Sequence, residues 1–295
     1  MSWIVIARKD FEDAVRSKTL WVITVLFVVF TAGGLYGIQL AFEDLSANAA
    51  VRFLDVPAGL IVPLAAIVVA YLSIAGERES GSIKLLLGLP HSRLDLVLGK
   101  LVGRTAVVAV ATVVAFASAA VVLVVYYGTF PVVKLLLMGL LTFLLGLVFV
   151  AIAIGLSAMT AKRSRAMAGA IGLFFLFELL WSIVTTGIAL LFDLGTSGGK
   201  FPAWYYLLQR LNPKNAYGIA AKIVAPMNKD YAITSNGSGN EAQQTTEAAK
   251  SMADTVIGGH VPFYLDNWFA FVILALWLVV PLAFGYWRFK RVDVS

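Results

Sequence analysis

The chain has 295 residues, of which 60% are hydrophobic and 14% charged, with a formal net charge of +6 at pH 7. Soluble domains are typically about 45–50% apolar and about 25% charged, so this composition excludes an ordinary soluble protein and predicts a membrane protein. The absence of cysteine excludes disulfides, catalytic thiolates and cysteine-based metal sites, and the two histidines, His91 and His260, are too few for a histidine-rich metal site. In a membrane protein basic residues report orientation first, so the net charge does not indicate nucleic-acid binding.

The first predicted element is an amphipathic helix over residues 1–19. At helical spacing, one face carries Ile4, Ala7, Phe11, Ala14 and Val15. The charged residues, Asp10 among them, are expected mostly on the other faces. This pattern predicts a helix that lies in the cytoplasmic membrane interface before the first span, and a generic surface anchor is the alternative it leaves open. The residues expected at the membrane interface are Arg8, Lys9, Phe11 and Arg16.

Six segments are apolar enough, and long enough, to cross a bilayer as helices of about 20 residues. They cover approximately residues 20–42, 55–75, 101–127, 132–159, 166–192 and 268–287. The predicted fold is therefore an all-α polytopic membrane protein with six transmembrane helices, organised as a single membrane domain over residues 1–295.

Lysine and arginine residues predict the orientation of these spans. They are concentrated in the N-terminal segment, in residues 76–104, in the short loop at 160–165 and in the C-terminal tail, which all lie on one side. The two short connections on the other side carry only Arg52 and Lys134. Because short loops rich in lysine and arginine stay in the cytoplasm, both termini are predicted to be cytoplasmic in a multi-pass protein of the cell membrane.

A charged insert with the sequence GERESGSIKLLLGLPHSR separates the second and third spans. Three charges come together near its start, and Ser80 or Ser82 can then cap a short apolar helix over residues 83–87. Such a helix would expose leucines on the cytoplasmic face, so lipid or a partner protein must cover them. The composition leaves both alternatives open.

The end of the insert predicts a stop and a new helix. Gly88 permits a left-handed conformation, and Pro90 cannot continue a helix. Ser92, followed three residues later by Asp95, is a capping-box pattern that starts the next helix. The insert is therefore a turn, a short helix, a stop and a second helix start, and it is too short to span the membrane.

Glu178 lies in the middle of the fifth predicted span, in the sequence LFFLFELLWSIV. A carboxylate there costs about 2.5–3.5 kcal/mol on insertion scales, so the side chain is expected to face protein or water. One interpretation is a residue of the substrate path or of a dimer interface. The other is a carboxyl group hydrogen-bonded to Ser182, one turn on, or to another span.

The long segment 193–267 is predicted to be extracytoplasmic. Its first part has an apolar stripe at helical spacing, which predicts short interfacial helices and consists of Trp204, Leu207, Leu208 and Leu211. Residues 228–255 are polar and contain Gly, Ser and Asn, so they are predicted to form a mobile loop. Within this loop Asn236 begins a glycosylation sequon, a short and common pattern.

The insert resembles the segment after the second span in type-2 ABC (ATP-binding-cassette) export permeases. That family has a Glu-Arg-Glu-x-Gly-Thr/Ser-like element, a leucine-rich short helix, a proline, a Ser-Arg pair and a Gly-Lys pair that enters the third span. The matching positions here are Glu77, Arg78, Glu79, Gly81, Ser82, Pro90, Ser92, Arg93, Gly99 and Lys100. Residues 7–11, 16–21 and the Leu-Asn-Pro element at 211–213 are also similar to family elements, so the resemblance covers nearly the whole chain. The resemblance is closest to the subgroup that includes the permease of the nitrous-oxide-reductase maturation transporter, and the detail is also similar to permeases of halophilic archaea.

This resemblance implies the permease subunit of an ATP-driven exporter. Two permease copies, identical or paralogous, would pair in the lipid bilayer, each docked on a separate ABC ATPase subunit that holds the ATP and Mg. The chain itself would carry no cofactor and no ATPase site, and it contains no GxxxxGK[ST] phosphate loop. Within the coupling segment 76–95, residues 82–88 would form the coupling helix. The residues implied to dock the ATPase subunit are Glu77, Arg78, Glu79, Ser80, Gly81, Ser82, Ile83, Lys84, Leu85, Leu86, Leu87, Pro90 and Arg93.

Two other functions stay open. The chain could be a non-transporting ABC-type membrane anchor that transmits ATPase motion to an extracytoplasmic protein through residues 193–267. A membrane-bound enzyme would need a converging set of catalytic groups, and only Glu178, His91 and His260 are available for one. Members of the resembling family differ in what they move, so the substrate does not follow from the fold.

Overall fold

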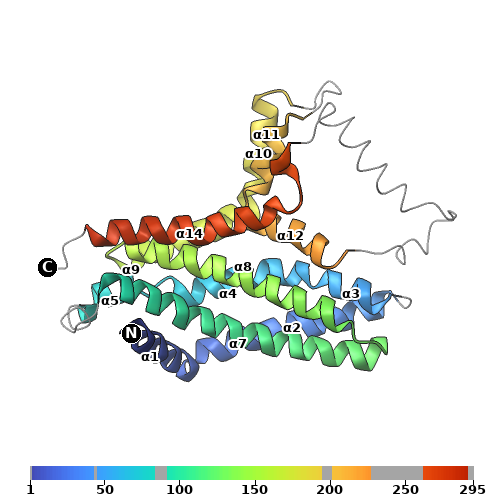
Figure 1. Cartoon of the computed structure of the whole chain (residues 1–295), viewed down its shortest axis with the longest axis horizontal. Helices are drawn as coiled ribbons and strands as arrows, with labels where there is room; N and C mark the ends of the chain where they lie inside the picture. The colour runs from blue at the N-terminus through green and yellow to red at the C-terminus, as the bar shows by residue number, and fades with distance from the viewer. Residues whose placement is uncertain (1, 43–44, 84–91, 195–200, 227–261, 292–295) are drawn as a thin grey trace.

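The computed structural model describes residues 2–42, 45–83, 92–194, 201–226 and 262–291. His91, His260, Gly88 and Asn236, together with residues 228–255, lie outside the described residues. Every regular element in the described part of the chain is helical (Figure 1). The elements are α1 (Ser2–Arg16), α2 (Lys18–Ala41), α3 (Ala47–Phe53), α4 (Asp55–Ala70), α5 (Ala75–Glu79), α7 (Arg93–Tyr127), α8 (Val132–Met159), α9 (Arg163–Phe175), η1 (Leu176–Leu180), α10 (Trp181–Leu191), α11 (Ala203–Arg210), α12 (Pro213–Val224), η4 (Phe263–Leu265) and α14 (Phe269–Lys290).

Six helical stretches in the described residues are long and apolar enough to cross a membrane, which confirms the predicted number of spans. The fourth span, α8, has the predicted bounds. The third begins at Arg93 rather than near residue 101. The starts of α1 and α5 and the end of α14 lie at one end of the bundle, here called the insert end (Figure 1).

The early start of α7 follows from its cap. The Ser92 hydroxyl accepts a hydrogen bond from the Asp95 backbone N–H at 3.0 Å, and the Asp95 carboxylate accepts one from the Ser92 N–H, also at 3.0 Å. This capping box confirms the predicted helix start. The charged residues that follow it belong to the helix, which extends beyond its apolar stretch.

We expect Ser92→Ala to lower the free energy of unfolding by about 1 kcal/mol, because it leaves the backbone N–H of Asp95, in the first turn of α7, without its acceptor. The measurement is the midpoint of thermal unfolding in detergent. Ser92→Asn is the matched control, since its side-chain oxygen can still accept the bond, and it should unfold close to the native chain. A native-like midpoint for Ser92→Ala would contradict the role of the cap.

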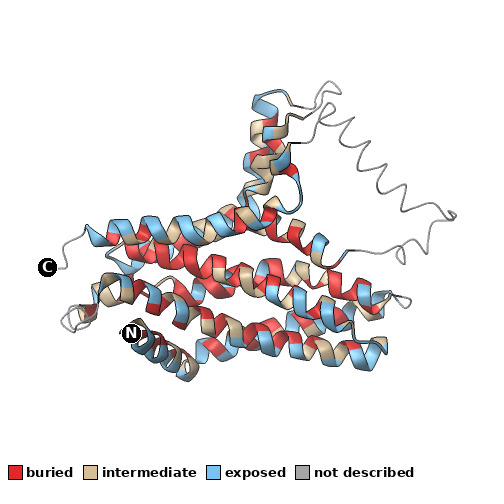
Figure 2. Ribbon diagram, viewed as in Figure 1, coloured by how far each residue is buried: buried red, intermediate tan, exposed pale blue. Residues whose placement is uncertain are grey.

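Helix α8 lies at the centre of the bundle and packs against α4, α7, α12 and α14. Its side chains Met138, Leu145 and Phe149 are fully buried. Figure 2 shows this buried centre beside helices whose outer faces are exposed, and those faces carry large apolar residues such as Val113 and Leu136. Apolar outer faces on a bundle of this length suit contact with lipid.

Helices α8 and α14 cross with their backbones in contact. A Cβ atom added to Gly285 would lie 2.5 Å from the carbonyl oxygen of Gly155, and one added to Gly155 would overlap the carbonyl of Pro281. Only glycine permits such an approach, which is a common way for membrane helices to pack. The crossing fixes α14 against the centre of the bundle.

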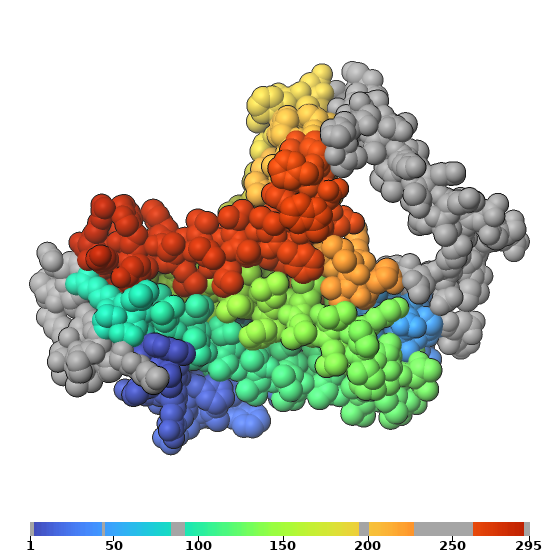
Figure 3. All heavy atoms as spheres, viewed as in Figure 1, coloured from blue at the N-terminus to red at the C-terminus, as the bar shows by residue number. Residues whose placement is uncertain are grey.

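The fifth span bends at a π-helical turn. Helix α9 continues through η1 into α10, and α10 then leaves the bundle beside α11 (Figures 1 and 3). The sequence had predicted one continuous span over 166–192. We call α10 and α11 together the side arm. Much of its apolar surface is exposed, including Leu190 and Leu191.

Short helices after the fifth span are confirmed as α11 and α12, but their packing differs from the predicted stripe. On α11 the buried residue is Tyr205, whereas Trp204 is 44% exposed. Helix α12 buries Ala216 and Tyr217 against the bundle, so it is part of the core and does not lie only at the interface. Helix α12 thus completes the packing around α4 and α8.

Candidate functional site

The N-terminal helix α1 packs along α7. Its buried residues include Ile6, Ala7 and Asp10, whereas Ile4 is 45% exposed. The face of α1 that packs on α7 therefore includes Asp10, which the pattern places mostly away from the apolar face, and it leaves Ile4 exposed. The reason is electrostatic, because α7 presents cations to Asp10 that the pattern of α1 alone does not contain.

Four side chains near the insert end form a cluster of alternating charge, which we call the charged cluster: Asp10, Glu77, Lys100 and Arg104. The Lys100 ammonium donates to Asp10 Oδ1 at 2.8 Å and lies 2.5 Å from Glu77 Oε1. The Arg104 Nε lies 2.7 Å from Asp10 Oδ2. The side chains of Asp10 and Lys100 are 3% and 9% exposed. Two carboxylates balance two cations here, and the cluster joins α1, α5 and α7.

Arg78 joins the insert to the end of α8. Its Nη1 donates to the carbonyl oxygen of Thr160 at 2.9 Å and to that of Ala158 at 3.4 Å. The last carbonyls of a helix have no partner within it, so the guanidinium satisfies groups that would otherwise be free. The buried Ser157 hydroxyl in turn accepts two backbone N–H groups at the start of α5, at 2.9 and 3.1 Å.

Glu79 joins the insert to the start of α9. Its carboxylate accepts the backbone N–H of Arg163, the first residue of α9. A carboxylate at a helix N-terminus is favoured by the free N–H groups and by the helix dipole. The Arg163 guanidinium donates to the carbonyl of Gly76 at 3.4 Å, so a second hydrogen bond connects α5 and α9.

Arg93, on the far side of the insert, joins α7 to the end of α14. Its Nη1 donates to the carbonyl oxygens of Phe289 at 2.6 Å and Lys290 at 3.0 Å. Its guanidinium also lies 5.4 Å from the centre of the Phe289 ring, within the range of a cation–π contact. Both flanks of residues 84–91 are thus bonded to the ends of spans.

The structure places the implied docking residues in two groups. Glu77, Arg78, Glu79 and Arg93 are engaged within the chain as described, and Ile83 is buried. The Ser80 and Ser82 hydroxyls lie 3.0 Å apart, and Gly81 adopts a left-handed φ of 77°. Outside the described residues lie Lys84, Leu85, Leu86, Leu87 and Pro90.

The residues of the predicted interface helix are all described and differ in exposure. Arg8, Lys9 and Arg16 are exposed on α1, and Phe11 is half-buried against the core. Sequence reasoning missed Asp10 and Arg104 as partners. The available signal was an acid on the N-terminal helix and a base on the helix that follows the insert, but it does not reveal which residues meet.

Glu178 lies within η1, in the middle of the fifth span. Its side chain is 2% exposed and forms an ion pair with Lys214, in the first turn of α12. Ser182, the partner considered from the sequence, instead donates to the carbonyl of Leu179 at 3.2 Å. Asn212 donates to the carbonyl of Phe177 at 2.7 Å, so α12 supports the backbone of the π-helical turn.

Comparisons with known proteins agree with this architecture. The profile of the family described as "ABC-2 family transporter protein" matches residues 4–294. The "Probable ABC transporter permease protein NosY" of Pseudomonas aeruginosa is 32% identical over 254 residues, which is 78% of this chain and 88% of that protein. The protein of the same name from Stutzerimonas stutzeri is 32% identical over 234 residues, which is 72% of this chain and 78% of that protein.

Both relatives are bacterial, so the similarity to permeases of halophilic archaea stays a prediction. The matched region includes the N-terminal helix, the insert and all six spans. The chain is therefore a multi-pass transmembrane ABC transporter permease and belongs to the ABC-2 family of transporter proteins.

Proposed function

We propose that this chain is the permease subunit of an ATP-driven exporter and that a separate ABC ATPase subunit docks on residues 76–95. The observation that carries the proposal is the bonding of both flanks of this segment. Four residues connect the insert to α7, α8, α9 and α14: Glu77, Arg78, Glu79 and Arg93. The connection extends to α1 because Lys100, which pairs with Glu77, also pairs with Asp10. A displacement of the insert would therefore act on the ends of most spans at once.

In this proposal the ATPase subunits hold ATP and Mg, and two copies of the permease pair in the membrane. Closure and separation of the ATPase subunits would move the inserts, and the charged cluster would pass that motion to α1 and α7. Rigid helices move as bodies, so the chain needs no catalytic group of its own. The insert end would face the cytoplasm, as the lysine and arginine distribution predicts.

A second candidate is a non-transporting anchor that transmits ATPase motion to an extracytoplasmic protein. The side arm favours it, because the arm projects from the bundle and exposes apolar residues (Figure 3). Both candidates need the same ATPase docking. They differ in whether ATP hydrolysis moves a solute across vesicles that contain the complex, or only changes the distance between spin labels on the side arm and on α14.

The test of ATPase docking is co-purification from membranes in mild detergent. We expect Leu85→Asp/Leu86→Asp to lose the bound ATPase subunit and its ATP turnover while the chain still inserts. Leu40→Asp is the matched control, because Leu40 is 66% exposed and lies in the last turn of α2, outside the insert. This variant should keep the subunit. An ATPase retained by the double variant, or one that never accompanies the native chain, would contradict the proposal.

A further inference from the structure

A polar pocket of about 720 Å³ lies toward the opposite end of the bundle from the charged cluster. Residues from α3, α4, α11 and α12 line it. Four of the lining side chains are cations and one, Asp55, is a carboxylate; the cations are Arg52, Arg210, Lys214 and Lys222. Sites for small molecules typically have volumes of about 300–1,000 Å³, so this space is large enough to hold one.

Only some of this positive charge is neutralised within the chain. Arg52 forms an ion pair with Asp55, and Lys214 forms one with Glu178 behind the pocket. Among the described residues no carboxylate forms an ion pair with Lys222, which is exposed on α12.

Arg210 adds a second cation that no ion pair within the described residues neutralises. Its guanidinium donates to the backbone carbonyls of Leu265 and Asp266. Burial lowers the pKa of Arg210, and the nearby Asp266 carboxylate raises it in part. Neutral carbonyls orient a guanidinium without removing its charge. The pocket therefore keeps an excess of positive charge.

Part of the remaining lining is suited to a polar ligand, although Val56 and Ile219 are apolar. Tyr206, Gln209 and Asn215 bring a hydroxyl and two amide groups to the pocket. Gly59 and Gly218 add no side chain, and the aliphatic stem of Lys214 lies along Gly59, where an added Cβ would be 3.6 Å from Lys214 Cε. The buried pair Arg52–Asp55 makes part of the wall rigid, since the Arg52 side chain is 8% exposed.

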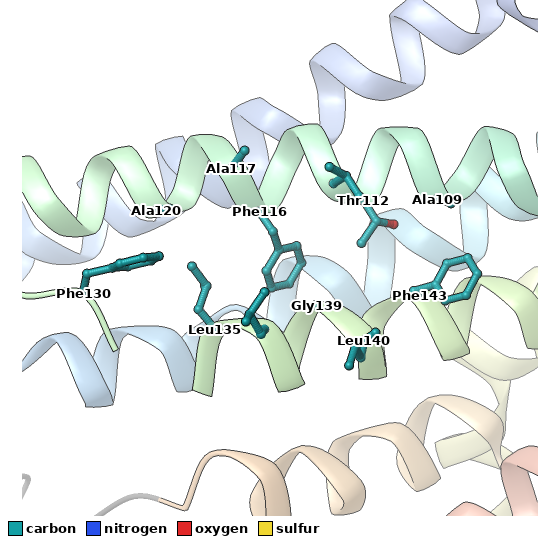
Figure 4. A pocket seen from close by; sticks show the side chains of 12 residues that line it. Ala109, Thr112, Phe116, Ala117, Ala120, Phe130, Leu135, Gly139, Leu140 and Phe143 are labelled. Carbon is teal, nitrogen blue, oxygen red and sulfur yellow. The ribbon is translucent and has the colours of Figure 1, made fainter. Parts of the chain in front are cut away.

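A second pocket has a different, apolar lining. Between α7 and α8 lies a space of about 450 Å³, lined by apolar residues and Thr112 (Figure 4). The Thr112 hydroxyl donates to the carbonyl of Val108 at 2.8 Å. That pocket offers no charged group to a ligand and suits hydrocarbon. The two pockets therefore differ in the chemistry that they can recognise.

We infer that the pocket between α3, α4, α11 and α12 binds an anion with a phosphate-like oxyanion group, held by Lys222 and Arg210. Lysine and arginine are the side chains that bind such groups through charge-assisted hydrogen bonds. The group can come from a lipid headgroup or from a free solute, and both share this chemistry. The inference does not rest on the proposed ATPase docking, since the pocket lies away from the insert.

The experiment uses the full chain, purified in a neutral detergent. Two probes are titrated at constant ionic strength and followed by calorimetry: inorganic phosphate, and a short-chain phosphatidylglycerol below its micellar concentration. Chloride replaces phosphate in the reference titration. We expect saturable binding of at least one probe and at least a fivefold weaker affinity in Lys222→Gln. The matched control, Lys9→Gln, changes an exposed lysine on α1 and should bind like the native chain.

Each outcome decides one point. Binding of phosphate alone assigns the pocket to a free solute, and binding of phosphatidylglycerol alone assigns it to a lipid headgroup. If neither probe binds the native chain, or if Lys222→Gln binds as tightly as the native chain, the inference is wrong. Loss of affinity in Lys9→Gln of the same size would also overturn it, because the effect would then report net charge. The unfolding midpoint of Lys222→Gln without ligand distinguishes a loss of binding from a loss of fold. This midpoint should equal that of the native chain.

Discussion

Replacing Gly285 with alanine is expected to lower the stability of the chain by about 3 kcal/mol, at the upper end of the cost of overpacking. The added methyl group would lie 2.5 Å from the carbonyl oxygen of Gly155 and 2.6 Å from its Cα. Both atoms belong to the backbone of α8, at the centre of the bundle, so neither can rotate away. The measurement is the midpoint of thermal unfolding in detergent, together with the fraction of monodisperse protein.

The matched control is Gly172→Ala in α9, where an added Cβ meets nothing within 4 Å. Alanine is the better helix former by about 0.5–1 kcal/mol, so this variant should equal or slightly exceed the native chain. A Gly285→Ala chain as stable as Gly172→Ala would show that α8 and α14 do not need their close crossing.

Replacing Lys100 with methionine is expected to cost about 3–5 kcal/mol, the usual penalty for removing one partner of a buried ion pair. The change leaves the Glu77 carboxylate without its cation and removes one of the two cations on Asp10. Because these residues join α1 and α5 to α7, we expect a lower unfolding midpoint. Protease should also cleave α1 faster.

Two further variants separate charge from packing at Lys100. Lys9→Met makes the same substitution at an exposed lysine of α1 and should leave the midpoint unchanged. Combining Lys100→Met with Asp10→Asn and Glu77→Gln removes the stranded charges and should recover most of the loss. If the triple variant is no more stable than Lys100→Met alone, the cost is one of packing and the cluster is not held by its charges.

The spans were predictable because the bilayer imposes a simple condition, a helix with about 20 apolar residues. For α8, which follows a short turn and ends before a basic loop, this condition alone gives both ends. It fails for α7, because Arg93 and Lys100 belong to the helix although they precede its apolar stretch. The capping box at Ser92 was the better guide, since a local hydrogen-bond pattern marks a helix start whatever the hydropathy of the first turns.

The charged contacts were less predictable because they depend on tertiary partners. The position of Glu178 indicated a buried carboxylate, but its cation, Lys214, comes from a different helix and lies 36 positions later in the chain. For the same reason, the pattern of α1 alone does not show that Asp10 is buried against the cations of α7. The insert was singled out from its sequence, yet nothing local indicates that its first arginine bonds the end of α8.

The π-helical turn at Leu176–Leu180 determines where the chain tolerates a change of length. A π-helical turn holds one residue more than an α-helical turn, because its hydrogen bonds span five residues and those of an α-helix span four. Deleting one residue within the turn could therefore restore an α-helix there and remove the bend between α9 and α10. The side arm would then point in a different direction, although the composition of the span would hardly change. Related chains can therefore share all six spans and still differ in the direction of this arm through a single insertion or deletion.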